Sequence, residues 1–207
     1  MKLPTQRHGL ALRVAKGHFA TNHSHTNYYI DVTAQKFRLS EAKAAARELT
    51  GEYKYRGAVD TILCLDGTEV IGACMASDMM KSGALTSNEH GSLYVLTPEH
   101  TTGSQLIFRE NTVPMITGKH VLILLASVST GYTAEAAMQA IRYYGGQVVG
   151  IASIFATVKE VAGVPVTHLF DTNDLVDYAS WDARSCPLCQ KGQKLDALVN
   201  SYGFSNL

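Results

Sequence analysis

One stretch of the sequence, residues 121–146, constrains the fold more than any other. It reads VLILLASVSTGYTAEAAMQAIRYYGG: a continuous apolar run, a turn of serine, threonine and glycine, and an alanine-rich helical pattern that ends at two glycines. A continuous apolar run is typical of a strand buried on both faces, and glycine commonly ends a helix. The stretch therefore predicts a strand, a loop and a helix in immediate succession.

The same alternation continues along the middle of the chain. Residues 40–53, SEAKAAARELTGEY, predict a helix that begins at the capping residue Ser40. Residues 59–83 predict a short strand, a break at DGT and a second helix, and residues 91–100, GSLYVLTPEH, predict another strand. Alternating strands and helices with apolar strands indicate a mainly parallel sheet that helices cover on both faces. We therefore expect a doubly wound α/β fold.

The two ends of the chain differ from this middle. Residues 1–37 are rich in His, Asn, Thr and Tyr, and residues 176–207 contain Trp181, a CxxC motif and a helix-like run, KLDALVNSYGF, at 194–204. Ligands of open α/β sheets bind beyond the carboxyl ends of the strands. We therefore expect one domain over 1–207, in which segment 1–37 and the C-terminal appendage 176–207 form a hood around the site.

Charge and hydropathy exclude several classes of protein. Eighteen Lys and Arg balance 18 Asp and Glu, so no overall field favours nucleic acid or an anionic membrane. No segment approaches the roughly 20 apolar residues of a membrane span, and the N-terminal MKLPTQRHGL lacks the apolar run of a secretory signal. We expect a cytoplasmic protein whose partners include neither nucleic acid nor a membrane.

The four cysteines fall into two groups. Cys64 and Cys74 lie in apolar surroundings, where a free cysteine commonly packs as a small hydrophobe. Cys186 and Cys189 form the CxxC of SCPLCQKG and would supply two of the four ligands of a zinc site, the others coming from distant His or Cys or from a second subunit. The alternative is a surface turn containing proline, and a reducing cytosol disfavours a permanent disulfide.

The turn at residues 127–133, SVSTGYT, has the composition of an anion site. Ser129, Thr130 and Thr133 can donate hydroxyl hydrogen bonds, and Gly131 permits close approach of a ligand to the backbone. The helix that begins near Ala134 directs its free N–H groups and the positive end of its dipole to the same place. The turn thus predicts a phosphate site, although an ordinary capped turn uses the same residues, and it lacks the Lys of a Walker loop.

Two longer segments carry a resemblance to a known family. Residues 121–150 resemble the phosphoribosyl pyrophosphate signature of the type I phosphoribosyltransferases: an apolar strand, two acidic residues, a Thr/Gly phosphate loop and a helix. Residues 17–32, GHFATNHSHTNYYIDV, resemble the opening of the orotate phosphoribosyltransferases, and DGTE at 66–69 stands where the family has its pyrophosphate loop. The resemblance implies a phosphoribosyltransferase-like fold of the orotate branch.

The resemblance also implies roles for individual residues. It places the 5′-phosphate on Ser129, Thr130, Gly131, Tyr132 and Thr133. It places pyrophosphate on Asp66, Gly67, Thr68 and Glu69. It places a hood over the base on Tyr28, Tyr29 and the stretch from His23 to Thr26, with His25 as its candidate histidine; a structural role for the tyrosines and a solvent-facing role for the histidines stay open.

Two departures from the family pattern concern charge. Leu125 and Ala126 stand where the family has the acidic residues that bind the ribose hydroxyls, so no carboxylate remains at those positions. Loss of two charge-assisted hydrogen bonds of about 1.5–3 kcal/mol each would remove roughly 10²- to 10⁴-fold of transition-state stabilisation. The segment that matches the mobile catalytic loop lacks lysine, and the nearest basic candidates are Arg109, His100 and Lys119.

Three functions follow from these residues. The first is transfer of phosphoribosyl to a base, with orotate as the first substrate. In this reading Asp66 or Glu69 holds Mg²⁺, and Arg109 offsets charge on the departing pyrophosphate. The resemblance to the orotate enzymes also implies a homodimer. The second is a regulatory protein that binds a nucleotide or sugar phosphate without turnover, which the missing acidic pair favours. The third is an interaction protein built around zinc or redox chemistry at CPLC.

Overall fold

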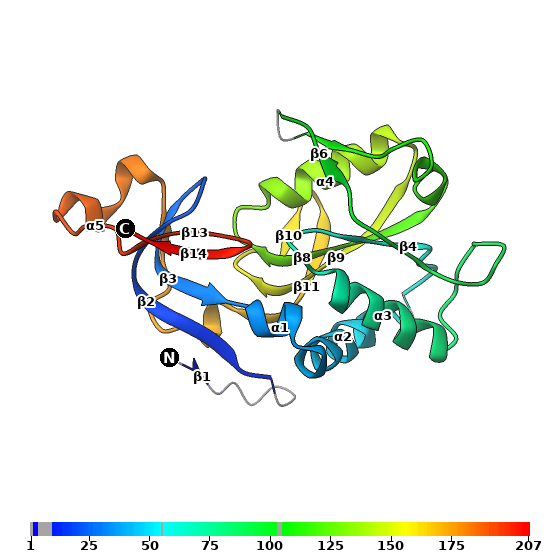
Figure 1. Ribbon diagram of the computed structural model, residues 1–207, viewed down its shortest axis with the longest axis horizontal. Helices are drawn as coiled ribbons and strands as arrows, with labels where there is room; N and C mark the ends of the chain where they lie inside the picture. The colour runs from blue at the N-terminus through cyan, green and yellow to red at the C-terminus, as the bar shows by residue number, and fades with distance from the viewer. Residues whose placement is uncertain (1, 4–9, 55, 103–104) are drawn as a thin grey trace.

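Two β-sheets carry the fold, and the helices pack mainly on one of them. The computed structural model describes residues 2–3, 10–54, 56–102 and 105–207. Figure 1 shows a core sheet flanked by helices and, beside it, a second sheet that contains both the N-terminal and the C-terminal segments. Most of residues 1–9, on which the expectation of no secretory signal rests, lie outside the described residues.

The core sheet has six strands in the order β10-β11-β9-β8-β4-β5, and every neighbouring pair is parallel except β10 with β11. The strands are β4 (Thr61–Cys64), β5 (Tyr94–Leu96), β8 (His120–Val128), β9 (Gln147–Ala156), β10 (Glu160–Val161) and β11 (Val164–Asp171). The apolar runs of β4 and β8 are buried on both faces, as a parallel sheet between helices requires. The predicted α/β fold class is confirmed.

Helices cover both faces of this sheet. They are α2 (Leu39–Tyr53), α3 (Glu69–Lys81) and α4 (Tyr132–Tyr143). Along β8, Leu122 and Leu124 belong to the apolar cluster that contains α2 and α3, whereas Ile123 and Leu125 belong to the cluster that contains α4. This alternation follows from the two-residue period of a strand. Arg38, not Ser40, is the cap of α2, and its side chain makes no capping bond.

The hood sheet joins the two ends of the chain in the order β12-β3-β2-β13-β14, with β1 paired to β2. Its strands are β1 (Lys2–Leu3), β2 (Leu12–Ala20), β3 (His25–Asp31), β12 (Ser180–Trp181), β13 (Ala197–Asn200) and β14 (Gly203–Asn206). The short elements outside the two sheets are α1 (Thr33–Phe37), α5 (Pro187–Gln190), η1 (Val113–Met115), η2 (Thr172–Asp174), η3 (Ala183–Ser185) and the hairpin of β6 (Glu99–His100) and β7 (Leu106–Ile107). Both ends of the chain therefore build one layer.

The helix expected over 194–204 is absent, and this prediction was wrong. The segment forms the β13–β14 hairpin, and β13 pairs in parallel with β2 through Ala197 and Leu198. Residues along β13 alternate between buried and exposed, which is the strand pattern. At the turn, the Asn200 side chain accepts hydrogen bonds from the backbone N–H groups of Tyr202 and Gly203. Pairing with a distant strand and this Asn turn outweigh the local helical preference.

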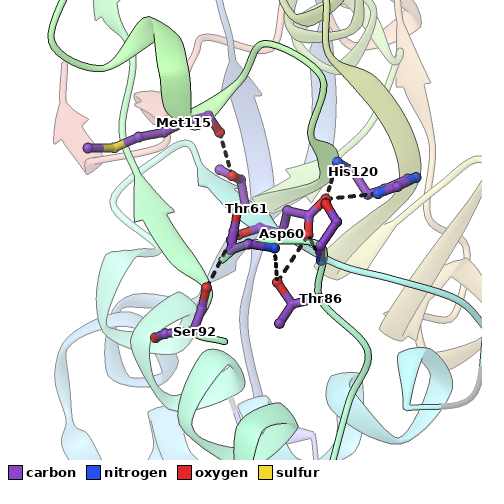
Figure 2. A network of polar contacts seen from close by, with 8 residues as sticks. Asp60, Thr61, Thr86, Ser92, Met115 and His120 are labelled. Atoms are coloured by element: carbon purple, nitrogen blue, oxygen red, sulfur yellow. Dashed lines mark hydrogen bonds and ion pairs between the residues drawn. The ribbon is translucent and has the colours of Figure 1, made fainter. Parts of the chain in front are cut away.

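A buried carboxylate, Asp60, fastens the amino ends of the core strands. Figure 2 shows it between the chain segments that contain Thr86 and His120. Its oxygens accept bonds from the Thr86 hydroxyl, the Ser87 hydroxyl and backbone N–H, and the backbone N–H and Nδ1 of His120. Burial alone would raise the pKa of Asp60, but these donors outweigh it and hold the pKa well below its usual value. This network lies at the strand ends opposite those where ligands of such sheets bind.

Across the residues that the structure describes, none of the helices is both long enough and apolar enough to cross a membrane.

Candidate functional site

A cavity of about 530 Å³ lies between the carboxyl ends of the core strands and the hood. The core contributes the ends of β4 and β8 and the start of α4, through residues such as Asp66, Ala126 and Thr133. The hood contributes the loop between β2 and β3, the face of β3, and the turn between β13 and β14. The cavity is therefore where an open α/β sheet binds its ligand.

The predicted phosphate loop forms one wall of this cavity. Ser129, Tyr132 and Thr133 line it, whereas Thr130 is exposed to solvent beside it. Gly131 is the N-cap of α4 and has a left-handed backbone (φ 84°); a Cβ there would approach Val161 to 3.0 Å. Because the cap residue is glycine, no cap side chain accepts hydrogen bonds from the first backbone N–H groups of α4, which face the loop. The wall can therefore hold an anion on hydroxyl and backbone donors.

The predicted pyrophosphate loop follows β4 and brings one carboxylate to the cavity. Asp66 lines the cavity with a left-handed backbone (φ 58°), and Gly67 continues the turn (φ 76°). Thr68 is fully buried, and its hydroxyl donates to the Leu65 and Leu124 carbonyl oxygens. Glu69 starts α3 and accepts a bond from the Thr97 hydroxyl. Of these four residues, Asp66 is the one whose side chain stands in the cavity wall.

A buried lysine, which the sequence reasoning missed, accompanies Asp66. Lys36 on α1 is 1% exposed and lines the cavity, and its Nζ donates to the backbone oxygens of Asp66 (2.8 Å) and Ser201. Burial lowers the pKa of Lys36, while nearby acidic groups, chiefly Asp66, oppose the shift. Burial likewise raises the pKa of Asp66, and Lys36 opposes that shift. The pair places a cation and a carboxylate on one wall of the cavity. The sequence of α1, TAQKF, contains no motif that identifies this lysine as a site residue.

Aromatic side chains from the hood form the opposite wall. Tyr28 is buried, stacks on Tyr178 (6.3 Å between centroids, 25° between planes) and donates its hydroxyl to the Val176 carbonyl oxygen (2.7 Å). Tyr29 also lines the cavity. His23, in the loop between β2 and β3, reaches across to Tyr132, with 5.6 Å between ring centroids. A flat ligand would therefore meet aromatic faces on this side.

His25 does not line the cavity. Its neighbours Ser24 and Thr26 do, and successive strand residues point to opposite faces, so the His25 ring lies on the other side of β3. There its Nδ1 lies 3.3 Å from the Cys189 sulfur and 3.1 Å from His18 Nε2. The structure thus brings His25 together with the CxxC motif instead of with the expected base site.

The basic candidates are dispersed. Arg109 follows β7 and is absent from the cavity lining; its exposed guanidinium makes a bidentate pair with Glu99, with a shortest distance of 2.6 Å. Lys119 precedes β8 at the amino end of the sheet, away from the cavity. His100, on β6, does line the cavity. The structure therefore separates Arg109 and Lys119 from the site and retains His100.

The two positions that lack acidic residues have different surroundings. Ala126 lines the cavity, and its backbone N–H bonds to the Asp66 carboxylate, which tends to lower the pKa of that acid. Both side chains are buried: Ala126 (2% exposed) belongs to the apolar cluster under α2 and α3, and Leu125 (1% exposed) packs in the cluster under α4. A side chain at 126 can thus meet a ligand, whereas one at 125 occupies the core.

Comparison with known proteins identifies the fold. No model of a known protein family matches the chain, and no curated protein sequence matches it. Solved structures do: orotate phosphoribosyltransferase from Mycobacterium tuberculosis H37Rv in complex with Fe(III) dicitrate has 17% identity and a TM-score of 0.54, covering 79% of this chain and 92% of that one. The UMP synthase of Leishmania donovani has 18% identity and a TM-score of 0.58 over 78% of this chain and 34% of that one.

A purine enzyme is about as similar as the pyrimidine enzymes. Adenine phosphoribosyltransferase from Leishmania donovani has 15% identity and a TM-score of 0.52, and the match covers 73% of each chain. These identities speak to the fold and leave the choice of base open. The chain has the fold of the type I phosphoribosyltransferases.

Proposed function

We propose that the cavity binds phosphoribosyl pyrophosphate or a nucleotide 5′-phosphate, and that the protein transfers phosphoribosyl to a pyrimidine-type base, with orotate as the first substrate to test. One observation carries the proposal: Ser129 and Thr133, at the glycine-capped start of α4, line the same cavity as Asp66 and Lys36. A phosphate on the loop leaves the ribose near Ala126 and the diphosphate near Asp66. The M. tuberculosis orotate enzyme has been solved with phosphoribosyl pyrophosphate and has the same fold.

The residues present fit a Mg²⁺ ion beside the diphosphate. Asp66 is the one carboxylate among the described residues that line the cavity, and Ser127, Ser129 and Ser201 also line it. Mg²⁺ binds few protein oxygens and takes the rest of its ligands from phosphates and water, so one carboxylate suits it. When bound, the ion would neutralise charge on the departing pyrophosphate. Glu69, bonded to Thr97 outside the cavity lining, is the weaker of the two expected ligands.

The protein's own groups would act mainly by positioning. The loop N–H groups and hydroxyls fix the 5′-phosphate, and Tyr28 and Tyr29 offer flat apolar surface to a base. Lys36 lies where it can stabilise negative charge that develops on pyrophosphate as the bond to ribose C1′ breaks. A base nitrogen forms the new bond to C1′, and pyrophosphate carries away the electron pair.

A second candidate function is a nucleotide-binding or sugar-phosphate-binding regulatory protein. The observation that favours it is Ala126 in the cavity wall, because no carboxylate stands there to hold the ribose hydroxyls. Arg109, which we expected to assist the leaving group, is paired with Glu99 on the surface. Binding of a nucleotide or sugar phosphate without turnover would support this second function.

The test of the phosphate site is Thr133→Val, which removes a cavity-lining hydroxyl with almost no change of shape. A lost hydrogen bond to a charged phosphate of about 1.5–3 kcal/mol corresponds to roughly 10- to 150-fold weaker binding. Titration calorimetry with ribose 5-phosphate measures it, and Thr117→Val is the matched control, since its hydroxyl bonds the Val113 and Tyr144 carbonyl oxygens and does not line the cavity. Equal affinity of wild type and Thr133→Val would refute the proposed phosphate site.

Turnover is tested separately. The wild type is incubated with Mg²⁺, phosphoribosyl pyrophosphate and a panel of bases that includes orotate and adenine, and pyrophosphate release is followed. Release with orotate supports the transferase, whereas tight donor binding without release with any base supports the regulatory protein. We also propose a homodimer, because closed twofold dimers are the commonest soluble oligomers; a monomer by light scattering at micromolar concentration contradicts it.

A further inference from the structure

Four side chains that bind metals meet on the face of the hood away from the cavity. They come from three segments: His18 from β2, His25 from β3, and Cys186 and Cys189 from the turn around α5. One ligand atom of each lies within 4.8 Å of all the others. Residues 18 and 186 are 168 positions apart in sequence, so the fold creates this convergence.

The distances within this His₂Cys₂ cluster agree with a single tetrahedral ion. With Zn–S of about 2.3 Å and Zn–N of about 2.05 Å, tetrahedral angles place neighbouring ligand atoms roughly 3.3–3.8 Å apart. In the structure, His18 Nε2 is 3.4 Å from the Cys186 sulfur and 3.7 Å from the Cys189 sulfur. His25 Nδ1 is 3.3 Å from the Cys189 sulfur and 3.1 Å from His18 Nε2, the second distance being slightly shorter than the tetrahedral spacing. One ion at the centre can therefore contact all four atoms.

The surroundings orient the histidine that is most deeply placed. His18 is fully buried, and its Nδ1 lies 2.9 Å from the Gln193 carbonyl oxygen and 3.2 Å from that of Lys194. A carbonyl can only accept, so Nδ1 carries the proton and the lone pair of Nε2 points into the cluster. Metal-binding histidines typically have such a carbonyl or carboxylate behind them. The protein has thus set the tautomer that a metal requires.

We infer that His18, His25, Cys186 and Cys189 bind one zinc ion as a closed structural site. Two cysteines and two histidines are a common zinc ligand set, and two thiolates balance the charge of the ion in this partly buried place. Both cysteines are free thiols in the structure. The two ligands that the CxxC motif lacked come from the histidine-rich N-terminal segment of the same chain.

The ion fastens the C-terminal segment to the hood. His18 and His25 flank the loop of residues 21–24, which lines the cavity and carries His23 to its contact with Tyr132. Cys186 and Cys189 belong to the segment that also pairs Trp181 with His25 and accepts the His18 backbone N–H on Asp196. Removing the ion releases both supports of this loop. We therefore expect, on the basis of the proposed function, that removing the ion lowers the affinity for a base-bearing nucleotide more than the affinity for ribose 5-phosphate.

The primary experiment measures metal and needs no ligand. The full chain, purified after removal of any histidine tag and without chelators, is analysed for zinc by mass spectrometry, and we expect one ion per chain. Cys189→Ser and His25→Gln change the two ligands that are not fully buried, so these variants should fold yet lose bound zinc. Cys74→Ser, at a half-buried thiol on α3 outside the cluster, is the matched control and should keep it.

Cobalt substitution gives a second readout. Co²⁺ in the site should show the intense visible bands of tetrahedral coordination and thiolate charge-transfer bands, and Cys189→Ser should weaken both. The inference fails if the folded wild type takes up neither zinc nor cobalt stoichiometrically, if Cys189→Ser and His25→Gln keep full zinc content, or if metal-replete protein contains a Cys186–Cys189 disulfide. Because no phosphoribosyl compound is used, these outcomes are independent of the proposed function.

Discussion

The end of β8 allows a sharp test, because its two non-acidic positions face opposite sides of the sheet. Ala126 packs on the α2–α3 side of the sheet and also lines the cavity, whereas Leu125 lies in the core under α4 and does not line it. We predict that Ala126→Asp folds and binds phosphoribosyl pyrophosphate more tightly in the presence of Mg²⁺. We predict that Leu125→Glu, the other half of the family's acidic pair, destabilises the protein instead.

The magnitudes follow from these surroundings. Leu125→Glu loses about 1.5–3 kcal/mol of apolar burial and adds a carboxyl group without a partner, which costs several kcal/mol more. The sum is a large part of the 5–15 kcal/mol that typically stabilises a domain. At 126, charge-assisted bonds to the ribose hydroxyls of about 1.5–3 kcal/mol would tighten donor binding roughly 10- to 150-fold. The neighbouring Asp66 carboxylate reduces this gain, because two adjacent acids raise each other's pKa until a cation binds.

Urea unfolding measures the first effect and titration calorimetry with and without Mg²⁺ measures the second. Ala126→Asn is the matched control for Ala126→Asp, since it has nearly the same size and no charge. Wild-type stability of Leu125→Glu would show that the face assigned to residue 125 is incorrect. A folded Ala126→Asp with the donor affinity and turnover of Ala126→Asn would show that the ribose does not lie at this strand end.

Two further predictions concern buried charges. Asp60→Asn should lower the free energy of unfolding by about 3–5 kcal/mol in urea at neutral pH, whereas the exposed Glu110→Gln should change it little. The folded-state pKa of Asp60 lies below its unfolded value, so its stabilising effect is present above about pH 4 and fades as the pH falls. The free energy of unfolding of the wild type should therefore approach that of the variant in acid. A constant difference in this free energy down to about pH 3 would contradict the prediction. Lys36→Met should weaken diphosphate binding roughly 10-fold or more while leaving inorganic phosphate binding nearly unchanged, and equal loss for both ligands would argue against its place beside the diphosphate.

The parts of the fold that could be predicted are those that local sequence determines. The apolar run of β8, the polar turn and the amphipathic helix α4 follow one another without interruption, so the period of the pattern alone located them. The same holds for β4 and α3, where Asp66 and Gly67 adopt the left-handed turn that a DG pair favours. Loop residues Ser129 and Thr133 were placed in the candidate site for this reason.

The parts that were missed depend on contacts between distant segments. The β13–β14 hairpin exists because β13 pairs with β2, and nothing within 194–204 records that partner. Lys36 becomes a site residue only because α1 folds against the turn after β4 and the turn at Ser201. His25 was expected over the base, but the face on which a strand residue lies depends on the pairing register. A shift of the register by one residue moves each side chain of the strand to the other face.

Asp66 connects the competing functions. The family pattern has two acids at the end of the strand equivalent to β8, and here the one carboxylate among the described residues of the cavity wall comes from the next strand, β4. Burial raises its pKa, and Lys36, a Ser201 hydrogen bond and the Ala126 N–H partly offset that shift. A carboxylate there can serve the diphosphate, whereas ribose hydroxyls near Ala126 have no acidic acceptor. We therefore expect this site to retain affinity for the phosphoribosyl donor more readily than rapid turnover. Comparing donor affinity with the rate of pyrophosphate release then separates the transferase from the regulatory protein.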